Sequence, residues 1–409
     1  MTKGGPLGAP FLIARPRTAR GLGSPGGAGG GGVGANYQAM RRLLAAVAAV
    51  SLGLAAPAAG APVIGDRAAG PTAGGFATDN FEYVTHVPLA NDTAGARIFG
   101  KYMYLTTSRG LNIYDISDPA APALTGTAVL PQQPYFGEED PDTNGKILLL
   151  NADVVDVEDK TNPTPIGTHD ADQHTISCIL DCTYAYGSEG AIVDLRDPTK
   201  PKVVGDWAKG TPAAGGGHDV TEIKPGLIVT STQPIMYLDA RKNPTKPKVL
   251  ALGSNEDKRF IHSNLWPRSG KERFLLVGGE TVGPQCGENA GAFMTWDTKN
   301  WKKTKSFKMV DEYRVKNGLY TDGDAPANLF CTHWFETHPK YRNGGLVAMA
   351  WYEHGVRLFD ISSQGKIKEA GYFIPYGGST SAAYWANNEI LYSVDYNRGL
   401  DVLRYTGKP

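Results

Sequence analysis

The chain repeats one short pattern seven times: an apolar run, an aspartate and usually a turn marked by proline. The runs are rich in the residues that form β-strands. Successive pattern aspartates lie 41, 38, 45, 58, 63 and 41 residues apart. A repeat of about forty residues that is built from strands is typical of a β-propeller blade, so the sequence predicts seven blades. The aspartates are Asp115, Asp156, Asp194, Asp239, Asp297, Asp360 and Asp401.

Each blade is expected to contain four antiparallel strands, with the innermost strand nearest the axis. The third repeat shows this best, with strands expected at 174–178, 183–186, 191–194 and 201–207. The last repeat ends at Tyr405 without an outer strand, and residues 81–88 have the pattern of the missing strand. Because a closed ring hides two open sheet edges, we expect this N-terminal strand to complete the last blade.

The phrases GLNIYD at 110–115, GAIVD at 190–194 and GVRLFD at 355–360 resemble the LVIVD-repeat family of exported bacterial β-propellers. The resemblance extends over roughly residues 76–406. It implies an all-β, seven-bladed propeller, and it implies no single activity, so function has to be argued from a site. The pattern aspartates themselves are expected to close the turns between third and fourth strands.

The segments before the repeats differ from them in composition. Residues 1–39 are low-complexity Gly, Ala and Pro and cannot form a core, so they are expected to lie outside the native product, which would begin at Met40. Residues 40–61 contain a basic pair, an apolar run and small residues, as in a secretory signal peptide, and the run is too short to span a bilayer. Residues 62–75 are a predicted flexible linker and 76–409 the propeller. The protein is therefore expected to be secreted, or associated with the cell surface.

Charge restricts the class of partner. The chain has 41 basic and 41 acidic residues, so no overall field attracts nucleic acid or an anionic membrane. Phosphate-binding loops, a nucleophile elbow and a helical zinc-protease motif are absent from the sequence. The expected partner is a small molecule, a glycan or a protein at the loop face, without nucleic acid binding or stable membrane insertion.

Four of the eight histidines occupy the same position in their repeats, close to the start of the inner strand. Because inner strands converge on the axis, we expect these imidazoles to meet near one mouth of the central channel and to hold one metal ion. Neutral imidazoles on rigid strands suit Cu, Zn, Fe or Ni. The alternative is a polar channel that holds water without metal. The four predicted ligands are His174, His218, His262 and His333.

Other polar residues are candidates on the same face. Glu138 and Glu139 have a comparable position in the second repeat and either complete the ligand set or form a solvated acidic loop. The loops that join second and third strands are expected to lie on the same face of the propeller as the histidines and to bind a polar ligand there. Those loop candidates are Arg109, Glu280, His354 and Arg398, while His86, His169, His338 and His354 are out of register and are interpreted as surface or rim residues.

Four cysteines in an exported chain predict two disulfide bonds. Cys178 and Cys182 flank a tight turn between the first two strands of the third blade. Cys286 and Cys331 lie on the histidine face, where a bond between them would fix the loop beside the predicted site. In an alternative reading Cys331 is a thiolate ligand, which copper would favour.

Two functions remain open from the sequence. The first is an exported metalloprotein that carries out metal-dependent oxidation or hydrolysis at the channel mouth. The second is a non-catalytic extracellular binding module that uses the loop face. No residue is assigned a catalytic role from the sequence.

Overall fold

The computed structural model describes residues 63–64, 75–88, 93–130, 138–171, 173–253, 260–280, 291–315 and 331–408. All described residues lie within the unit Ala55–Pro409. The predicted low-complexity segment and signal peptide, and most of the predicted linker, therefore lie outside the described residues.

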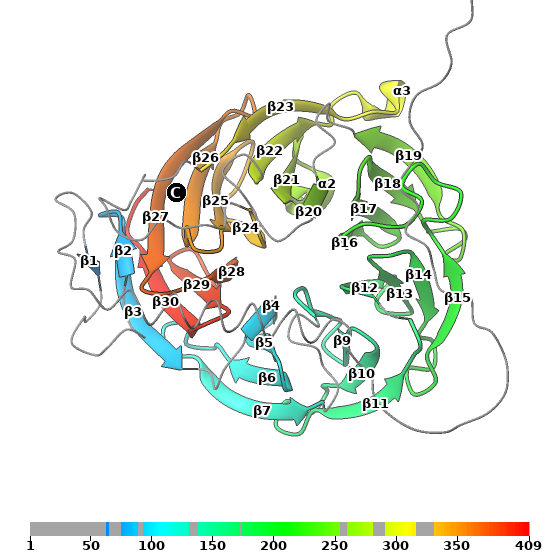
Figure 1. The fold of residues 1–409 in the computed structure, drawn as a ribbon, viewed down its shortest axis with the longest axis horizontal. Coiled ribbons are helices and arrows are strands. Elements are labelled where there is room, and N and C mark those ends of the chain that lie inside the picture. Colours follow the sequence, from blue (N-terminus) through cyan, green and yellow to red (C-terminus); the bar gives the residue numbers. More distant parts are fainter. Residues whose placement is uncertain are drawn as a thin grey trace, which may run out of the picture. The chain divides into compact units, whose positions relative to one another are not determined.

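Seven antiparallel sheets surround a central axis, which confirms the predicted seven-bladed propeller (Figure 1). Blade 1 contains β4 (Thr93–Phe99), β5 (Tyr102–Thr107), β6 (Gly110–Asp115) and β7 (Ala123–Val129). Blade 2 contains β8 (Asp142–Thr143), β9 (Ile147–Leu150), β10 (Asp153–Asp156) and β11 (Thr164–Thr168). Blade 3 contains β12 (Ile176–Ile179), β13 (Tyr184–Gly187), β14 (Ala191–Asp194) and β15 (Lys202–Asp206). Blade 4 contains β16 (Asp219–Lys224), β17 (Leu227–Ser231), β18 (Ile235–Asp239) and β19 (Lys248–Gly253).

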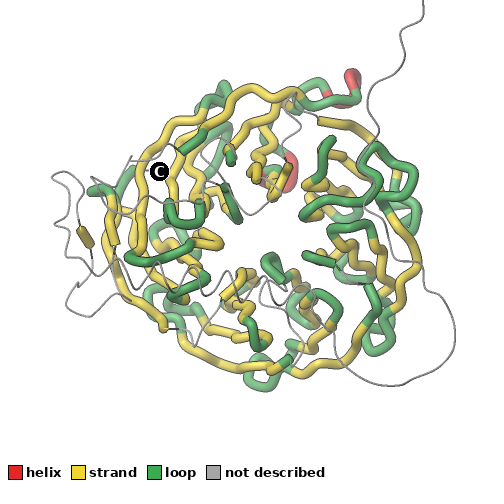
Figure 2. Tube along the Cα trace, in the orientation of Figure 1, coloured by secondary structure: helices red, strands yellow, loops and turns green. Residues whose placement is uncertain are grey.

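The remaining blades have the same order. Blade 5 contains β20 (Phe260–Leu265), β21 (Phe274–Glu280), β22 (Ala292–Asp297) and β23 (Lys308–Tyr313). Blade 6 contains β24 (Phe335–Thr337), β25 (Gly345–Ala350), β26 (Val356–Ile361) and β27 (Ile367–Pro375). Blade 7 contains β28 (Thr380–Trp385), β29 (Ile390–Asp395), β30 (Gly399–Tyr405) and β3 (Phe81–Pro88). Two helical turns, α2 (Pro267–Gly270) and α3 (Trp301–Thr304), are the only helices that the described residues form (Figure 2).

The hydrophobic core lies between neighbouring blades. Met103 and Leu105 of blade 1 belong to one buried cluster with Tyr392 and Val402 of blade 7. Apolar side chains on the facing surfaces of two sheets leave water together, which is the main stabilising term for such a packing. The outer strand β15, by contrast, is largely exposed. Packing between blades fixes each inner strand relative to the next, so side chains at the inner-strand ends are held on rigid supports.

Most pattern aspartates close turns, in agreement with the role expected from the sequence. Each of five accepts a hydrogen bond from the backbone N–H two residues later, at 2.7–3.1 Å. This local bond satisfies a backbone donor where the third strand ends and so fixes the turn to the outer strand. The five are Asp115, Asp156, Asp194, Asp239 and Asp297.

The N-terminal strand closes the ring, as predicted. β3 pairs antiparallel with β30 from Phe81 opposite Tyr405 to Pro88 opposite Gly399. The chain also adds an unpredicted strand, β2 (Gly75–Ala77), to the outer edge of blade 6 by pairing with β27, and β1 (Val63–Ile64) pairs with β2. The N-terminal segment therefore contributes to two neighbouring blades.

A buried carboxylate in blade 7 leads to a pH-dependent prediction. Asp395, at the end of β29, is fully buried, and burial raises its pKa from 3.8 to about 6 although backbone N–H groups donate to it. The folded state therefore keeps the Asp395 proton at pH values where the unfolded chain has lost it. Stability from this group is present below pH 4 and is lost as pH rises from about 4 to 6, by at most about 3 kcal/mol.

We expect Asp395→Asn to remove this loss, because the amide oxygen can still accept from the N–H groups of Asn397 and Arg398. Chemical denaturation from pH 4 to pH 8 should show the variant gaining stability relative to the wild type as pH rises. Asp118→Asn, at an exposed turn, is the matched control and should show no such trend. A constant difference between Asp395→Asn and the wild type across this range would contradict the prediction.

Candidate metal centre

The four predicted histidines come from four consecutive blades. His174 and His333 each lie two residues before an inner strand, β12 and β24, while His218 directly precedes β16 and His262 lies within β20. The propeller brings these ends toward its axis, so the residues gather although up to 159 positions separate them in the sequence. Glu139, which precedes β8 of blade 2, joins them.

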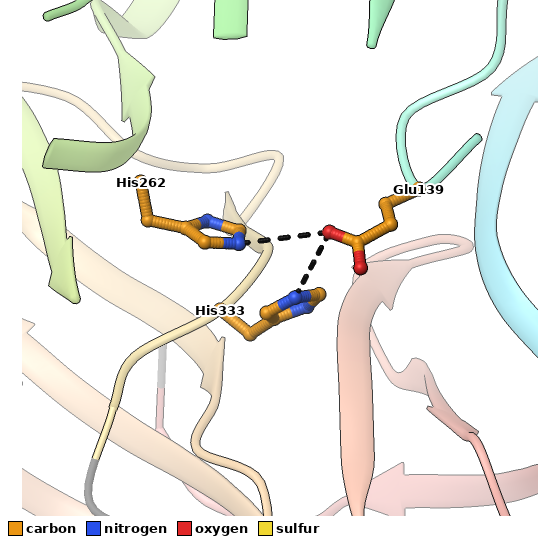
Figure 3. A group of neighbouring side chains, drawn as sticks. All are labelled: Glu139, His262 and His333. Carbon is orange, nitrogen blue, oxygen red and sulfur yellow. Dashed lines mark ion pairs between the residues drawn. The ribbon is translucent and has the colours of Figure 1, made fainter. Parts of the chain in front are cut away.

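The Glu139 carboxylate lies at the centre of the group. Its Oε2 atom is 3.5 Å from Nε2 of His174, 3.9 Å from that of His218, 3.7 Å from that of His262 and 3.1 Å from that of His333. The Nε2 atoms of His174 and His218 are 3.0 Å apart. Figure 3 shows His262 and His333 pointing toward the same Glu139 oxygen. One carboxylate oxygen thus faces four imidazole nitrogens.

Neighbouring groups orient both kinds of candidate ligand. His333 Nδ1 lies against the carbonyl oxygen of Ser381, which can only accept, so Nδ1 carries the proton and Nε2 presents its lone pair. The Tyr396 hydroxyl donates to Oε1 of Glu139 at 2.8 Å, which leaves Oε2 for the histidines. Such outer contacts are typical of metal sites, where they fix the tautomer and the ring orientation of the ligands.

Several polar atoms here are buried without a hydrogen-bond partner among the described residues. They include Oε2 of Glu139 and both ring nitrogens of His262. Glu139 is 4% exposed and His262 is 0% exposed, so bulk solvent does not reach these atoms. An unsatisfied buried polar group costs about 1–3 kcal/mol, and such groups in a native protein call for an explanation such as an ion. The His174 side chain, at 31% exposure, gives solvent access to the group.

Electrostatics favour the protonation states that metal binding requires at Glu139, His218 and His262. Burial raises the pKa of Glu139, but His333 and His174 outweigh this effect, and the pKa lies well below its ordinary value. Burial, together with His333, lowers the pKa of His262 to about 3. Burial and the neighbouring His262 also hold the pKa of His218 well below its ordinary range. At His174 the Glu139 carboxylate outweighs burial and raises the pKa, so this imidazole has to lose its proton when it binds a metal, whereas His218 and His262 already have the neutral form that binds a cation.

Glu280 belongs to the same region. It ends β21 and forms a possible ligand group with His218 and His262, whose ligand atoms all lie within 4.8 Å of one another. The Tyr352 hydroxyl donates to its Oε1 at 2.9 Å. Burial raises the pKa of Glu280 to about 7. Of the four loop candidates predicted from the sequence, Glu280 is the one that these ligand groups include.

Glu138 has a different role from its neighbour. Its two carboxylate oxygens accept backbone N–H groups of Asn151, at 2.9 Å, and Asp140, at 3.3 Å. It is 2% exposed and Glu139 4%, so the solvated acidic loop considered from the sequence is wrong. Glu138 supports the local backbone, whereas Glu139 faces the histidines.

The other loop candidates are not in the ligand groups that the described residues form. Arg109 is exposed at the turn between β5 and β6. Arg398 is buried and pairs with Asp401 at 2.8 Å, so it holds blade 7 together instead of facing a ligand. His354 is fully buried in the turn between β25 and β26. The position of Arg398 and His354 in the loops between second and third strands did not predict that their side chains are buried.

The expectation that the out-of-register histidines lie at the surface is wrong for three of them. His169 is 6% exposed, His338 is 2% exposed and His354 is 0% exposed. His338 is buried because its Nε2 bonds to the carbonyl of Asn388 at 2.9 Å and its ring packs edge-on against Trp385. His338 thus packs against blade 7.

Cys178 and Cys182 form a disulfide bond across the turn between β12 and β13. Cys331 is also disulfide-bonded, so the alternative that it is a free thiolate ligand is wrong. Its predicted partner, Cys286, lies outside the described residues.

Two tyrosines near the centre were not predicted from the sequence. Tyr396 contacts Glu139 and lies 3.2 Å from Nε2 of His333, and Tyr352 contacts Glu280. Both lie just after the second strand of their blade, and Glu280 is the last residue of the second strand of its blade. Glu280 was predicted because it belongs to a loop between second and third strands. The same criterion would have predicted Tyr352 and Tyr396 if tyrosines had been considered.

Comparison with known proteins identifies the repeat and the fold. The LVIVD repeat model matches residues 92–128, which include all of blade 1 except its last residue. No curated protein sequence matches the chain. The β-propeller domain of Myceliophteria thermophila Cps50 (Swd1) has 12% identity and a TM-score of 0.54, and covers 79% of this chain and 99% of its own.

Two further solved structures have the same fold. U3-55K has 8% identity and a TM-score of 0.52, with 80% of this chain and 98% of its own covered. YCF48 bound to D1 peptide has 10% identity and a TM-score of 0.50, with 81% and 98% covered. Identities this low support the propeller architecture alone. In the described part of the chain, no helix has the length and apolar character needed to cross a membrane.

Proposed function

We propose that this LVIVD-repeat β-propeller is an exported metalloprotein that binds a transition metal at one end of its axis. The observation that carries the proposal is the position of Glu139 Oε2, within 3.9 Å of four imidazole nitrogens from four blades and without a hydrogen-bond partner in the described structure. Groups of histidine and carboxylate with this spacing could hold a metal ion. Imidazole and carboxylate together suit Zn, Cu, Fe or Ni.

The surroundings of the centre favour chemistry at the metal over a purely structural role. A structural metal is usually enclosed by protein ligands, whereas His174 keeps 31% of its side chain exposed. A transition metal at such a position supplies Lewis-acid activation of water or one-electron chemistry, so metal-dependent hydrolysis or oxidation is the proposed reaction type. Glu280, with a pKa of about 7, is suited to accept or donate a proton beside the site at neutral pH.

Elemental analysis of the purified full-length chain tests the metal proposal. We expect a transition metal in the wild type and a lower metal content in His218→Ala, because His218 belongs to two of the possible ligand groups. His86→Ala is the matched control, since His86 bonds to Asp401 in blade 7, and it should keep the metal. A folded wild type that takes up none of these metals would reject the proposal and favour the binding module.

Export makes a separate prediction. Signal peptidase should remove the segment up to about residue 61, because the apolar run and small residues at 43–61 have the pattern that it recognises. Mass spectrometry of secreted protein should find an N-terminus between residues 56 and 65. Protein that folds in the cytoplasm with Met1 retained and with Cys178 and Cys182 reduced would overturn both the localisation and the link between export and the disulfide.

A further inference from the structure

Two of the three possible ligand groups share one residue, Glu139, and have no histidine in common. Glu139, His174 and His218 form one group, and Glu139, His262 and His333 form the other. Within each group all ligand atoms lie within 4.8 Å of one another, and no such group among the described residues contains all four histidines. Two ligands of a single ion with bonds of about 2.0–2.1 Å lie at most about 4.2 Å apart. One ion therefore cannot bind all four imidazoles in this arrangement.

The rings follow one another in blade order. The ring centroids of His174 and His218 are 4.5 Å apart, those of His218 and His262 are 3.7 Å apart, and those of His262 and His333 are 4.2 Å apart. His174 and His333 are thus the ends of an arc, and Glu139 faces the whole arc. A single ion at the His174 end would leave the fully buried His262 and His333 without a metal, and one at the other end would leave His174 and His218 without one.

We propose that the centre is dinuclear, with His174 and His218 on one metal ion, His262 and His333 on the other, and Glu139 as the bridge. This inference rests on the proposed metal function and replaces the single ion expected from the sequence. A carboxylate oxygen has two lone pairs, so Oε2 can serve both ions. The Tyr396 hydroxyl, which donates to Oε1, holds the carboxylate with Oε2 toward both histidine pairs.

A second carboxylate lies where two ions would require negative charge. Glu280 forms a group with His218 and His262, which are the adjacent members of the two different pairs. It therefore stands at the junction of the proposed sites, where it can offset charge from both ions. Two metals that share carboxylates typically lie about 3.5–4 Å apart, as in hydrolytic two-metal sites.

Metal stoichiometry tests the proposal. The full-length protein is freed of metal by chelation, loaded with Co²⁺ or Zn²⁺ alone, dialysed and measured by elemental analysis. We expect two ions per chain. One ion per chain would overturn the dinuclear proposal and leave the metal function standing, whereas no ion would reject the metal function itself.

Paired variants assign the ligands. The double variant His174→Ala/His218→Ala and the double variant His262→Ala/His333→Ala should each retain one ion, because each leaves one group intact. The matched control is His218→Ala/His262→Ala, which also removes two histidines but takes one from each group, so both ions should be lost or bound far more weakly. Complete loss of metal in both within-pair variants would overturn the proposal, because it would require one ion that depends on both pairs.

Electron paramagnetic resonance tests the bridge in the wild type directly. Two Cu²⁺ ions joined by one carboxylate oxygen should couple magnetically, so the wild type loaded with Cu²⁺ should show far less of the isolated-ion signal than its copper content predicts. Each within-pair variant should restore the isolated signal at full intensity. A wild type that binds two Cu²⁺ with uncoupled spectra would show two separate sites and contradict the bridge.

Discussion

Replacing Glu139 with glutamine should weaken metal binding by more than the roughly 10–100-fold loss that follows removal of an outer contact of a metal site. The Glu139 Oε2 atom lies within 3.9 Å of all four imidazole nitrogens, and the glutamine amide removes the negative charge while keeping the size of the side chain. Titration calorimetry of the metal-free protein with Zn²⁺ measures the effect. Thermal unfolding gives a second readout, since a metal at 1,000 times its Kd stabilises the folded state by about 4 kcal/mol.

Glu138→Gln is the control for this substitution. Glu138 is the neighbouring residue, carries the same side chain and is also buried, but its oxygens accept backbone N–H groups. It should bind Zn²⁺ as the wild type does and show the same metal-dependent shift in unfolding. Equal losses in the two variants would mean that the local backbone, and not the Glu139 carboxylate, controls the metal.

The blade repeat was predictable because its signals are local. Strand β14 occupies the predicted residues 191–194, since an apolar run and a turn-forming aspartate define both its ends. The first strand of that blade was less well defined: residues 174–178 were expected and β12 begins at Ile176. His174 lies before the first paired residue, at the point where the backbone turns toward the axis. The sequence pattern therefore predicted that the strand exists but not the residue at which its pairing with the next strand begins.

The composition of the centre was only partly predictable. Register placed the four histidines at equivalent blade positions, and the ring closure explains why these positions meet. The sequence could not separate Glu138 from Glu139, because only the backbone path decides which carboxylate accepts N–H groups and which faces the axis. Nor could it divide the histidines into pairs, since this depends on distances between blades.

The closing strand should control the cooperativity of the whole propeller. Deleting residues 76–90 removes β3 and two of the three residues of β2, leaves the outer edge of β30 unpaired and reopens the ring. We expect the deletion to abolish cooperative unfolding and to promote aggregation, because an open edge strand with buried apolar residues can pair with other chains. Circular dichroism during thermal or urea unfolding, combined with light scattering, measures both effects.

Point substitutions in β3 separate strand packing from the loss of chain length. Phe81 is 3% exposed, and its ring lies 5.9 Å from that of Tyr405, so Phe81→Ala should cost about 3–5 kcal/mol. The adjacent Glu82 side chain is 59% exposed and pairs with Arg404 at 3.5 Å, so Glu82→Ala should cost less than about 1 kcal/mol.

A peptide of residues 79–90 added to the deleted chain should restore cooperativity, since it can pair with the free edge of β30. A deleted chain that unfolds at the wild-type midpoint with the same sharpness would show that the ring closes without β3.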